Sequence, residues 1–251
     1  MTEELFAAIY ADPDDDSPRH VLADYLSDRG DPRGEFISLQ LARGRSDVRL
    51  ARELELLQAH VTEWLGPLAP VIDARRTRFE RGFMASVAIA RNTKKLLRQL
   101  AGERGWATVE LFITGVPPQL LDRANFSALR EIWVHAGEFR RLARRGDALP
   151  SVEHVVLYDS VDRGDLSRVF PSLRSARLRF EPSREELATL AAIGVRDLAI
   201  DGVAFLGSEP IDSSEFVESI CASRSPFERV GVGELDLRRA DDGMLRPHRR
   251  K

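Results

Sequence analysis

The chain has 251 residues, of which 43% are hydrophobic and 31% are charged, and its formal net charge is −3. This composition is ordinary for a soluble globular protein, and the charge gives no global basic field that would attract nucleic acid. The single cysteine excludes an internal disulfide and cannot form a zinc cluster alone. No apolar run approaches the roughly 18 residues of a membrane span, and the acidic start MTEELFAAIYADPDDD lacks the parts of a signal peptide. We therefore expect a cytoplasmic protein without membrane contact.

The first part of the chain carries the signals of four helices. A short helix is predicted over residues 3–10, where two early glutamates suit the positive end of the helix dipole. Ser-Pro at 17–18 and Asp-Pro at 31–32 each combine an N-cap residue with a first-turn proline, so each predicts a further helix. Apolar residues at helical spacing predict a longer helix over about 47–65. Its apolar stripe would consist of Leu50, Leu54, Leu57, Val61 and Leu65.

The acidic run between the first two helices starts with the spacing of an EF-hand calcium loop. Asp12, Asp14 and Asp16 match its first three ligand positions. The glycine required at the sixth position is Ser17, however, and the glutamate required at the twelfth is Ala23. Because both departures fall on residues that the loop geometry needs, we interpret the run as a solvated turn between helices.

Residues 3–43 include the segment ADPDDDSPRHVLADYLSDRGDPRGEFISLQLA. This segment resembles the short repeat-companion domain found at the N-termini of many planctomycete and myxobacterial proteins. The resemblance rests on the acidic run, LADYL, RGDPRGEFI and the following LQ. In that family the domain often precedes leucine-rich or other repeats, so the resemblance implies that a repeat array follows and assigns no catalytic residue.

The remainder of the chain repeats the pattern apolar-x-x-apolar-x-apolar, the strand core of a leucine-rich repeat. The third apolar position recurs at intervals of 22, 23, 23, 21, 22 and 32 residues, and only the last exceeds the length of one such unit. The long interval contains the insertion LGSEPIDSSE. The seven matches are Met84/Val87/Ile89, Trp106/Val109/Leu111, Leu129/Ile132/Val134, Val152/Val155/Leu157, Leu173/Ala176/Leu178, Val195/Leu198/Ile200 and Phe227/Val230/Val232.

Helix-like segments separate these strand cores, and a strand alternating with a helix predicts a parallel sheet with outer helices. The predicted fold is therefore α/β: a helical repeat-companion cap over 1–70, then a leucine-rich-repeat-like solenoid of about seven strands over 71–237. The asparagine that often follows the strand in such repeats is absent, which favours an atypical array. Residues 238–251 are predicted to be a disordered basic tail. The expected outer helices are 93–104, 117–125, 138–145, 184–192 and 214–223.

Strand alternation places the residues between the apolar positions on the open face of the sheet. In the middle strands these residues are aromatic or histidine, between acidic and basic flanks. Large amphipathic aromatics beside arginine are typical of protein-binding hot spots, and extended partners dock on the concave face of repeat arrays. The predicted protein-binding residues are Glu110, Phe112, Glu131, Trp133, His135, His154, Tyr158, Arg177 and Arg179.

Other interpretations of this surface remain open at the level of sequence. The chain's own tail or helices, or a second copy, could cover Trp133 and Tyr158. A one-residue error in strand register would instead place Trp133 in the core.

The favoured function is a non-enzymatic adaptor or scaffold whose partner is a protein of unknown identity, with no cofactor, metal or small-molecule substrate expected. The main alternative is an enzyme or a zinc or iron site built on His135, His154, Glu110 and Glu131. No HExxH, GxSxG, P-loop or GxGxxG motif accompanies these residues. We interpret Cys221, on the apolar side of a predicted helix, as a buried structural thiol.

A further alternative is nucleic-acid binding through the C-terminal tail. The segment RRADDGMLRPHRRK carries six Arg or Lys residues and two Asp residues. Such a tail could contact nucleic acid or an acidic partner. No recognised nucleic-acid-binding motif accompanies it, so we keep this function as an alternative to protein binding.

Overall fold

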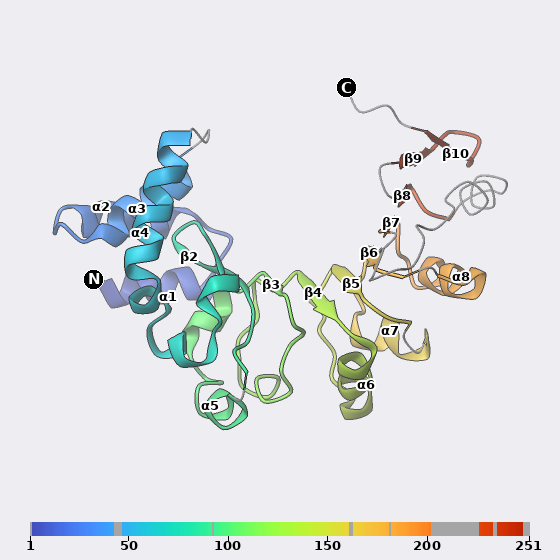
Figure 1. The fold of residues 1–251 in the computed structure, drawn as a ribbon, viewed down its shortest axis with the longest axis horizontal. Helices are drawn as coiled ribbons and strands as arrows, with labels where there is room; N and C mark the ends of the chain where they lie inside the picture. Colours follow the sequence, from blue (N-terminus) through green and yellow to red (C-terminus); the bar gives the residue numbers. More distant parts are fainter. Residues whose placement is uncertain are drawn as a thin grey trace, which may run out of the picture. The chain divides into compact units, whose positions relative to one another are not determined.

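The computed structural model describes residues 2–42, 47–91, 93–160, 163–180, 182–201, 226–232 and 235–247. They form a mixed α/β fold with two compact units, residues 1–129 and 130–251 (Figure 1). The division does not coincide with the boundary predicted at residue 70, because the helices share a unit with the first strands. None of the helices in the described ranges combines the length and the apolar composition that crossing a membrane requires.

The four predicted N-terminal helices are present. They are α1 (Thr2–Ala11), α2 (Ser17–Ser27), α3 (Pro32–Leu41) and α4 (Asp47–Leu65). Both prolines occupy first-turn positions, and the Asp31 carboxylate caps α3 by accepting the backbone N–H of Arg33 at 2.9 Å. The N-cap of α2 is Asp16 rather than the expected Ser17.

The acidic run forms a hydrogen-bonded turn. The Asp12 carboxylate accepts the backbone N–H of Asp14 at 3.2 Å, and the Asp15 carboxylate accepts that of Ser17 at 2.8 Å. The second bond favours the charged carboxylate and so lowers the pKa of Asp15. These bonds give two of the acids a local structural role, as expected for a turn between helices.

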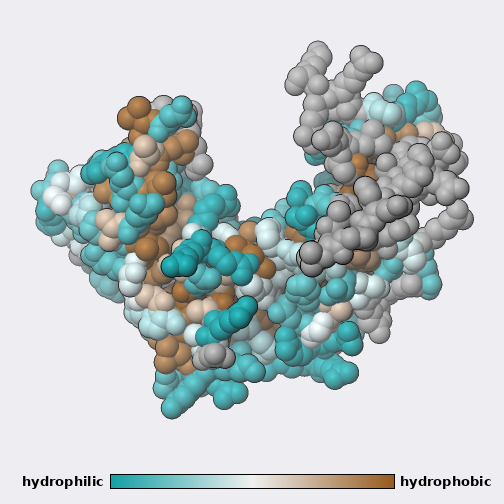
Figure 2. Space-filling model, viewed as in Figure 1, coloured by the Kyte–Doolittle hydropathy of each residue, from teal (hydrophilic) through white to brown (hydrophobic). Residues whose placement is uncertain are grey.

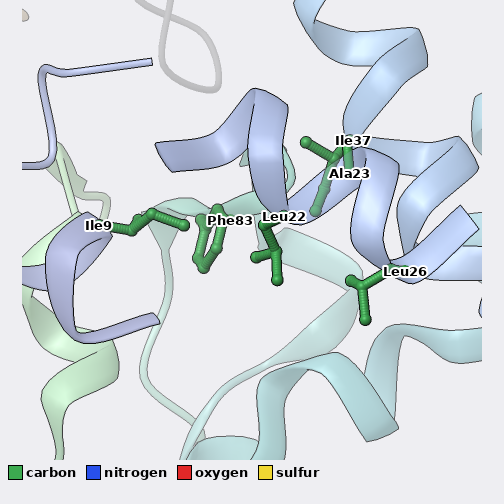
Figure 3. Packing of buried hydrophobic residues seen from close by; sticks show 6 residues of the cluster. All are labelled: Ile9, Leu22, Ala23, Leu26, Ile37 and Phe83. Atoms are coloured by element: carbon green, nitrogen blue, oxygen red, sulfur yellow. The ribbon is translucent and has the colours of Figure 1, made fainter. Parts of the chain in front are cut away.

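The core of the helical region is a cluster contributed by α1, α2, α3 and the first residue of β2 (Figure 3). Its buried members are Ile9, Leu22, Ala23, Leu26, Ile37 and Phe83. The close packing of α2 on α3 depends on Gly34, because a Cβ there would lie 2.5 Å from the backbone nitrogen of Ser27. The RGDPRGEFI motif thus supplies a helix cap, a first-turn proline and a close helix contact.

The buried side of α4 differs from the prediction. Leu65 is buried as expected, but Leu50 and Leu54 are 40% and 54% exposed. The helix instead buries Leu56 and Trp64, and the Trp64 ring lies 4.5 Å from that of Phe36. The predicted stripe therefore leaves apolar side chains at the surface along α4 (Figure 2, upper left).

Beyond α4, two short 3-10 helices, Gly66–Val71 and Ala74–Arg76, lead into the first strands. Strands β1 (Arg78–Glu80) and β2 (Phe83–Val87) form an antiparallel hairpin. Its two-residue turn has φ values of 53° at Arg81 and 82° at Gly82, as a type I′ turn requires.

The rest of the first unit is less regular. It comprises α5 (Lys94–Gln99), a 3-10 helix (Arg104–Thr108) and β3 (Leu111–Phe112), which runs parallel to β2. The helix predicted over residues 117–125 is wrong, since this segment consists of turns. Two consecutive prolines at its start remove backbone donors and restrict the preceding residue.

The second unit is built on five parallel strands that pair in chain order. They are β4 (Glu131–Val134), β5 (His154–Leu157), β6 (Ser175–Leu178), β7 (Asp197–Ile200) and β8 (Arg229–Val232). The predicted apolar positions align across every pair, so that Ile132 lies beside Val155 and Val134 beside Leu157. All the template residues on these five strands are buried.

Helices α6 (Ala136–Arg145), α7 (Arg163–Val169) and α8 (Arg184–Ala192) lie along one side of this sheet (Figure 1). Leu166 of α7 and Leu190 of α8 line a small cavity with Leu157 and Leu178 of the strands. The template residues therefore face the helices, and none of the helices in the described part of this unit covers the opposite face of the sheet. The predicted helix over 214–223, which contains Cys221, lies outside the described residues.

The prediction that the C-terminal tail is disordered is wrong over residues 238–247. Strands β9 (Leu235–Arg239) and β10 (Leu245–Pro247) pair antiparallel, and β9 also pairs antiparallel with β8. Buried Asp236 accepts hydrogen bonds from Arg229 of β8 at 2.8 and 3.1 Å. Basic residues of the tail are thus held by acidic partners within a sheet.

The close helix contact at Gly34 leads to a prediction. Gly34→Ala should lower the free energy of unfolding by about 2–3 kcal/mol, because the new methyl group meets backbone that cannot move cheaply. Gly137→Ala, also in the first turn of a helix but facing open space, should be neutral or stabilising by up to about 1 kcal/mol. Urea unfolding of both variants measures the difference. Equal effects would contradict the packing role of Gly34.

Candidate functional site

Side chains along β4 point alternately toward the helices and toward the opposite face of the sheet. Ile132 and Val134 are fully buried toward the helices, whereas Trp133 between them is half-buried on the other side. The register places Trp133 beside Val156 and then Arg177 on the same face. We use "open face" for the residues of the second unit that the sequence predicted there: Glu131, Trp133, His135, His154, Tyr158, Arg177 and Arg179.

Three rings form the centre of the open face. The Trp133 and Tyr158 rings meet at 60° with their centroids 6.5 Å apart, and His135 stacks on Tyr158 at 4.5 Å. The Trp133 indole N–H donates to the Glu131 carboxylate at 2.6 Å. This bond satisfies the polar edge of the indole and orients its ring, while much of the ring stays accessible.

His135 is held at the point where β4 ends and α6 begins. Its Nδ1 lies 3.1 Å from the Asp159 carboxylate, which also accepts the backbone N–H of Ala136 at 3.3 Å. The Glu138 carboxylate accepts the backbone N–H of His135 at 3.2 Å, which helps to cap α6. The imidazole is thereby fixed by its ring stacking and by a carboxylate, although its side chain is 59% exposed.

The basic flank of the open face is organised by one acidic residue. The Asp201 carboxylate lies 3.8 Å from Arg177 and 3.1 Å from Arg179. The Arg179 Nε has no hydrogen-bond partner among the described residues. Two arginines that share a single carboxylate retain net positive charge, so this flank suits an acidic group on a partner.

His154 begins β5 and is exposed, beside Glu131 on one neighbouring strand and Ser175 on the other. The sequence missed Asp159 and Asp201 as organising residues. A signal existed for both, because each lies within two residues of the end of a strand and loops at strand ends commonly carry functional polar groups.

Two of the predicted protein-binding residues, Glu110 and Phe112, belong to the first unit and so are not part of the open face. Phe112 is fully buried, with its ring 6.1 Å from Trp106 and 5.5 Å from Phe126, so its predicted exposure is wrong. The cause is a shift in register, since β3 aligns Phe112 with core-facing Val87. Glu110 forms a 2.6 Å ion pair with Arg81.

The residues considered for acid–base or metal chemistry are not brought together as a ligand set. No group of three His, Cys, Asp or Glu side chains suited to a metal ion occurs in the part of the chain that the structure describes. Glu131 and Glu110 are engaged by Trp133 and Arg81, respectively. What the arrangement presents is a fixed aromatic surface with charged flanks.

The fold and this face together define a class: mixed α/β proteins with a mostly parallel sheet covered by helices on one side. No family model, curated protein or solved structure matches the chain.

The alternation along β4 leads to a prediction about stability. Ile132→Ala should lower the free energy of unfolding by about 2–5 kcal/mol, because it leaves a cavity in the core. Trp133→Ala, although it removes a larger side chain, should cost less than about 1.5 kcal/mol, because the ring is already partly in water. Urea unfolding followed by circular dichroism compares the two. A larger loss for Trp133→Ala would mean that this side chain belongs to the core.

Proposed function

We propose that the protein is a non-enzymatic adaptor that binds a protein partner through the open face. The observation that carries this proposal is the fixed, partly exposed cluster of Trp133, His135 and Tyr158 on a sheet face that the described helices α6–α8 do not cover. Aromatic residues of this size bury roughly 150–250 Å² each on contact. Their bonds and stacking hold them before binding, which reduces the entropic cost of association.

The proposed architecture is a leucine-rich-repeat-like solenoid. It is supported by five parallel strands in chain order, a helix after each of β4, β5 and β6, and template residues recurring every 21 to 23 residues over 134–200. We further propose that α1–α3 form a repeat-companion domain. The positions of Asp31, Pro32 and Gly34 in the cap and packing of α3 support this assignment.

The open face offers a partner two kinds of anchor. The rings of Trp133 and Tyr158 provide apolar area, and the arginines beside Asp201 provide donors for a carboxylate. A partner that fits would place an apolar side chain over the rings and an acidic side chain toward Arg177. Rim charges of this kind contribute more to specificity and association rate than to affinity.

The adaptor proposal predicts that a partner captured from native lysate is lost by the double variant Trp133→Ala/Tyr158→Ala. Binding to the purified partner should weaken at least about 30-fold, the loss typical of hot-spot residues. The matched control is Arg141→Ala/Arg144→Ala, two exposed changes on α6, on the covered side of the sheet, which should bind normally.

Circular dichroism and urea unfolding must show that the double variant is folded. Retention of the same partner by the folded double variant would refute binding through the open face. Loss of the partner by the control variant would do the same, since it would place the contact on the helical side.

A further inference from the structure

A pocket of about 470 Å³ lies within the first unit, well inside the size range of small-molecule sites. Its walls come from α1, the C-terminal end of α4, the start of β2 and the loop that leads into the 3-10 helix Arg104–Thr108. Four aromatic residues line it: Phe6, Tyr10, Trp64 and Phe83. No residue of the open face contributes to this pocket.

Arg33 supplies a positive charge to the pocket wall without a matching carboxylate. Among the described residues the only hydrogen bond of its guanidinium runs from Nη2 to the Gly82 carbonyl oxygen at 3.4 Å, and Nε has no partner. The guanidinium lies 5.1 Å from the Phe6 ring centre and 5.0 Å from that of Phe83. Burial lowers the pKa of Arg33, which is the expected response of a cation removed from water.

Three acidic residues line the pocket: exposed Glu3 and Glu63, and half-buried Glu103. The Glu3 and Glu63 side chains are 81% and 72% exposed. Glu3 already pairs with Arg104 at 2.8 Å, and Glu63 lies 3.1 Å from His60. Water and salt screen the exposed carboxylates of Glu3 and Glu63 strongly, so the more deeply buried guanidinium of Arg33 acts on a bound molecule more strongly than either of them.

The aromatic walls favour a flat, apolar molecular body. The Phe6 and Tyr10 rings stack with their centroids 6.1 Å apart, and both meet the Phe83 ring edge-on, at 5.9 and 6.0 Å. All three aromatic residues line the pocket. A planar ring would gain apolar and edge-to-face contacts against this cluster.

We propose that this pocket binds a small aromatic carboxylate, with the carboxylate on the Arg33 guanidinium and the ring against Phe6 and Tyr10. The guanidinium matches the planar geometry of a carboxylate and would gain an ionic partner that none of the described residues supplies. This site is independent of the adaptor proposal, because it uses only residues of the first unit.

The test uses three probes that share one ring and differ in charge: 2-naphthoate, neutral 2-naphthamide and cationic 2-naphthylmethylamine. Isothermal titration calorimetry on the full chain should show that 2-naphthoate binds at least about 10-fold more tightly than either of the others, because only it can pair with Arg33. Equal affinities, preference for the amine, or no binding of 2-naphthoate at millimolar concentration would each overturn the proposal.

Methionine methyl groups report where the probe binds without any substitution. The chain has three methionines, of which Met84 lines the pocket and Met244 lies in the second unit. With ¹³C-methyl-methionine labelling, 2-naphthoate should shift the Met84 signal and leave that of Met244 unchanged. A shift of Met244 alone would place binding elsewhere and refute the proposed site.

Arg33→Met should abolish the preference for 2-naphthoate over 2-naphthamide while leaving the weaker binding of the amide unchanged. Arg29→Met is the matched control, since Arg29 lies over the Tyr25 ring and does not line the pocket. It should retain the full charge preference. If Arg33→Met proves unfolded, Arg33→Lys replaces it, with a reduced preference expected because a lysine lacks the forked donor pair. An unchanged preference in the folded variant would overturn the proposal.

Discussion

The parallel register of β4–β8 is the constraint on which the second unit depends. Each strand places its apolar template residues beside those of its neighbours, so that Ile132, Val155 and Ala176 follow one another in a buried row. Since side chains alternate between the two faces, the same register aligns Trp133 with Val156 and Arg177 on the open side. A slip of the register by one residue would bury the aromatic face and expose the apolar core to water. The free-energy cost of that exposure fixes the register, and the register in turn keeps the proposed binding surface on the open side.

In the first unit, Phe83 has a comparable central position. It packs in the core with Ile9 and Leu22, its ring contacts Phe6 and Tyr10, and the guanidinium of Arg33 lies over it. The tight turn before it directs β2 into the helices. Phe83 therefore belongs both to the helical core and to the wall of the proposed carboxylate pocket.

The two proposals draw on different chemistry in different units. The open face presents rings whose polar edges are already satisfied and whose flanking charges are shared, which suits a broad and adaptable protein contact. The pocket instead places Arg33, which has no ionic partner among the described residues, beside aromatic walls, and this suits a small ligand of opposite charge. Because each rests on separate residues, the result of one experiment leaves the other proposal standing.

The sequence by itself determined the helix starts at Ser-Pro and Asp-Pro, the strands β4–β8 at the last five apolar triplets, and the alternation that separates Trp133 from Ile132. These features are local, because caps, prolines and period-two patterns act within a few residues. Only the tertiary structure decided that α4 buries Trp64 rather than Leu54, that Phe112 enters the core, and that the basic tail forms a hairpin. The first two depend on a partner distant in the chain, such as Phe36 for Trp64, and no local pattern specifies that partner. The tail pairs with neighbouring segments instead, β9 with β8 and with β10. The sequence did not predict the proposed carboxylate pocket for the same reason as the first two, since its walls come from segments more than 90 residues apart.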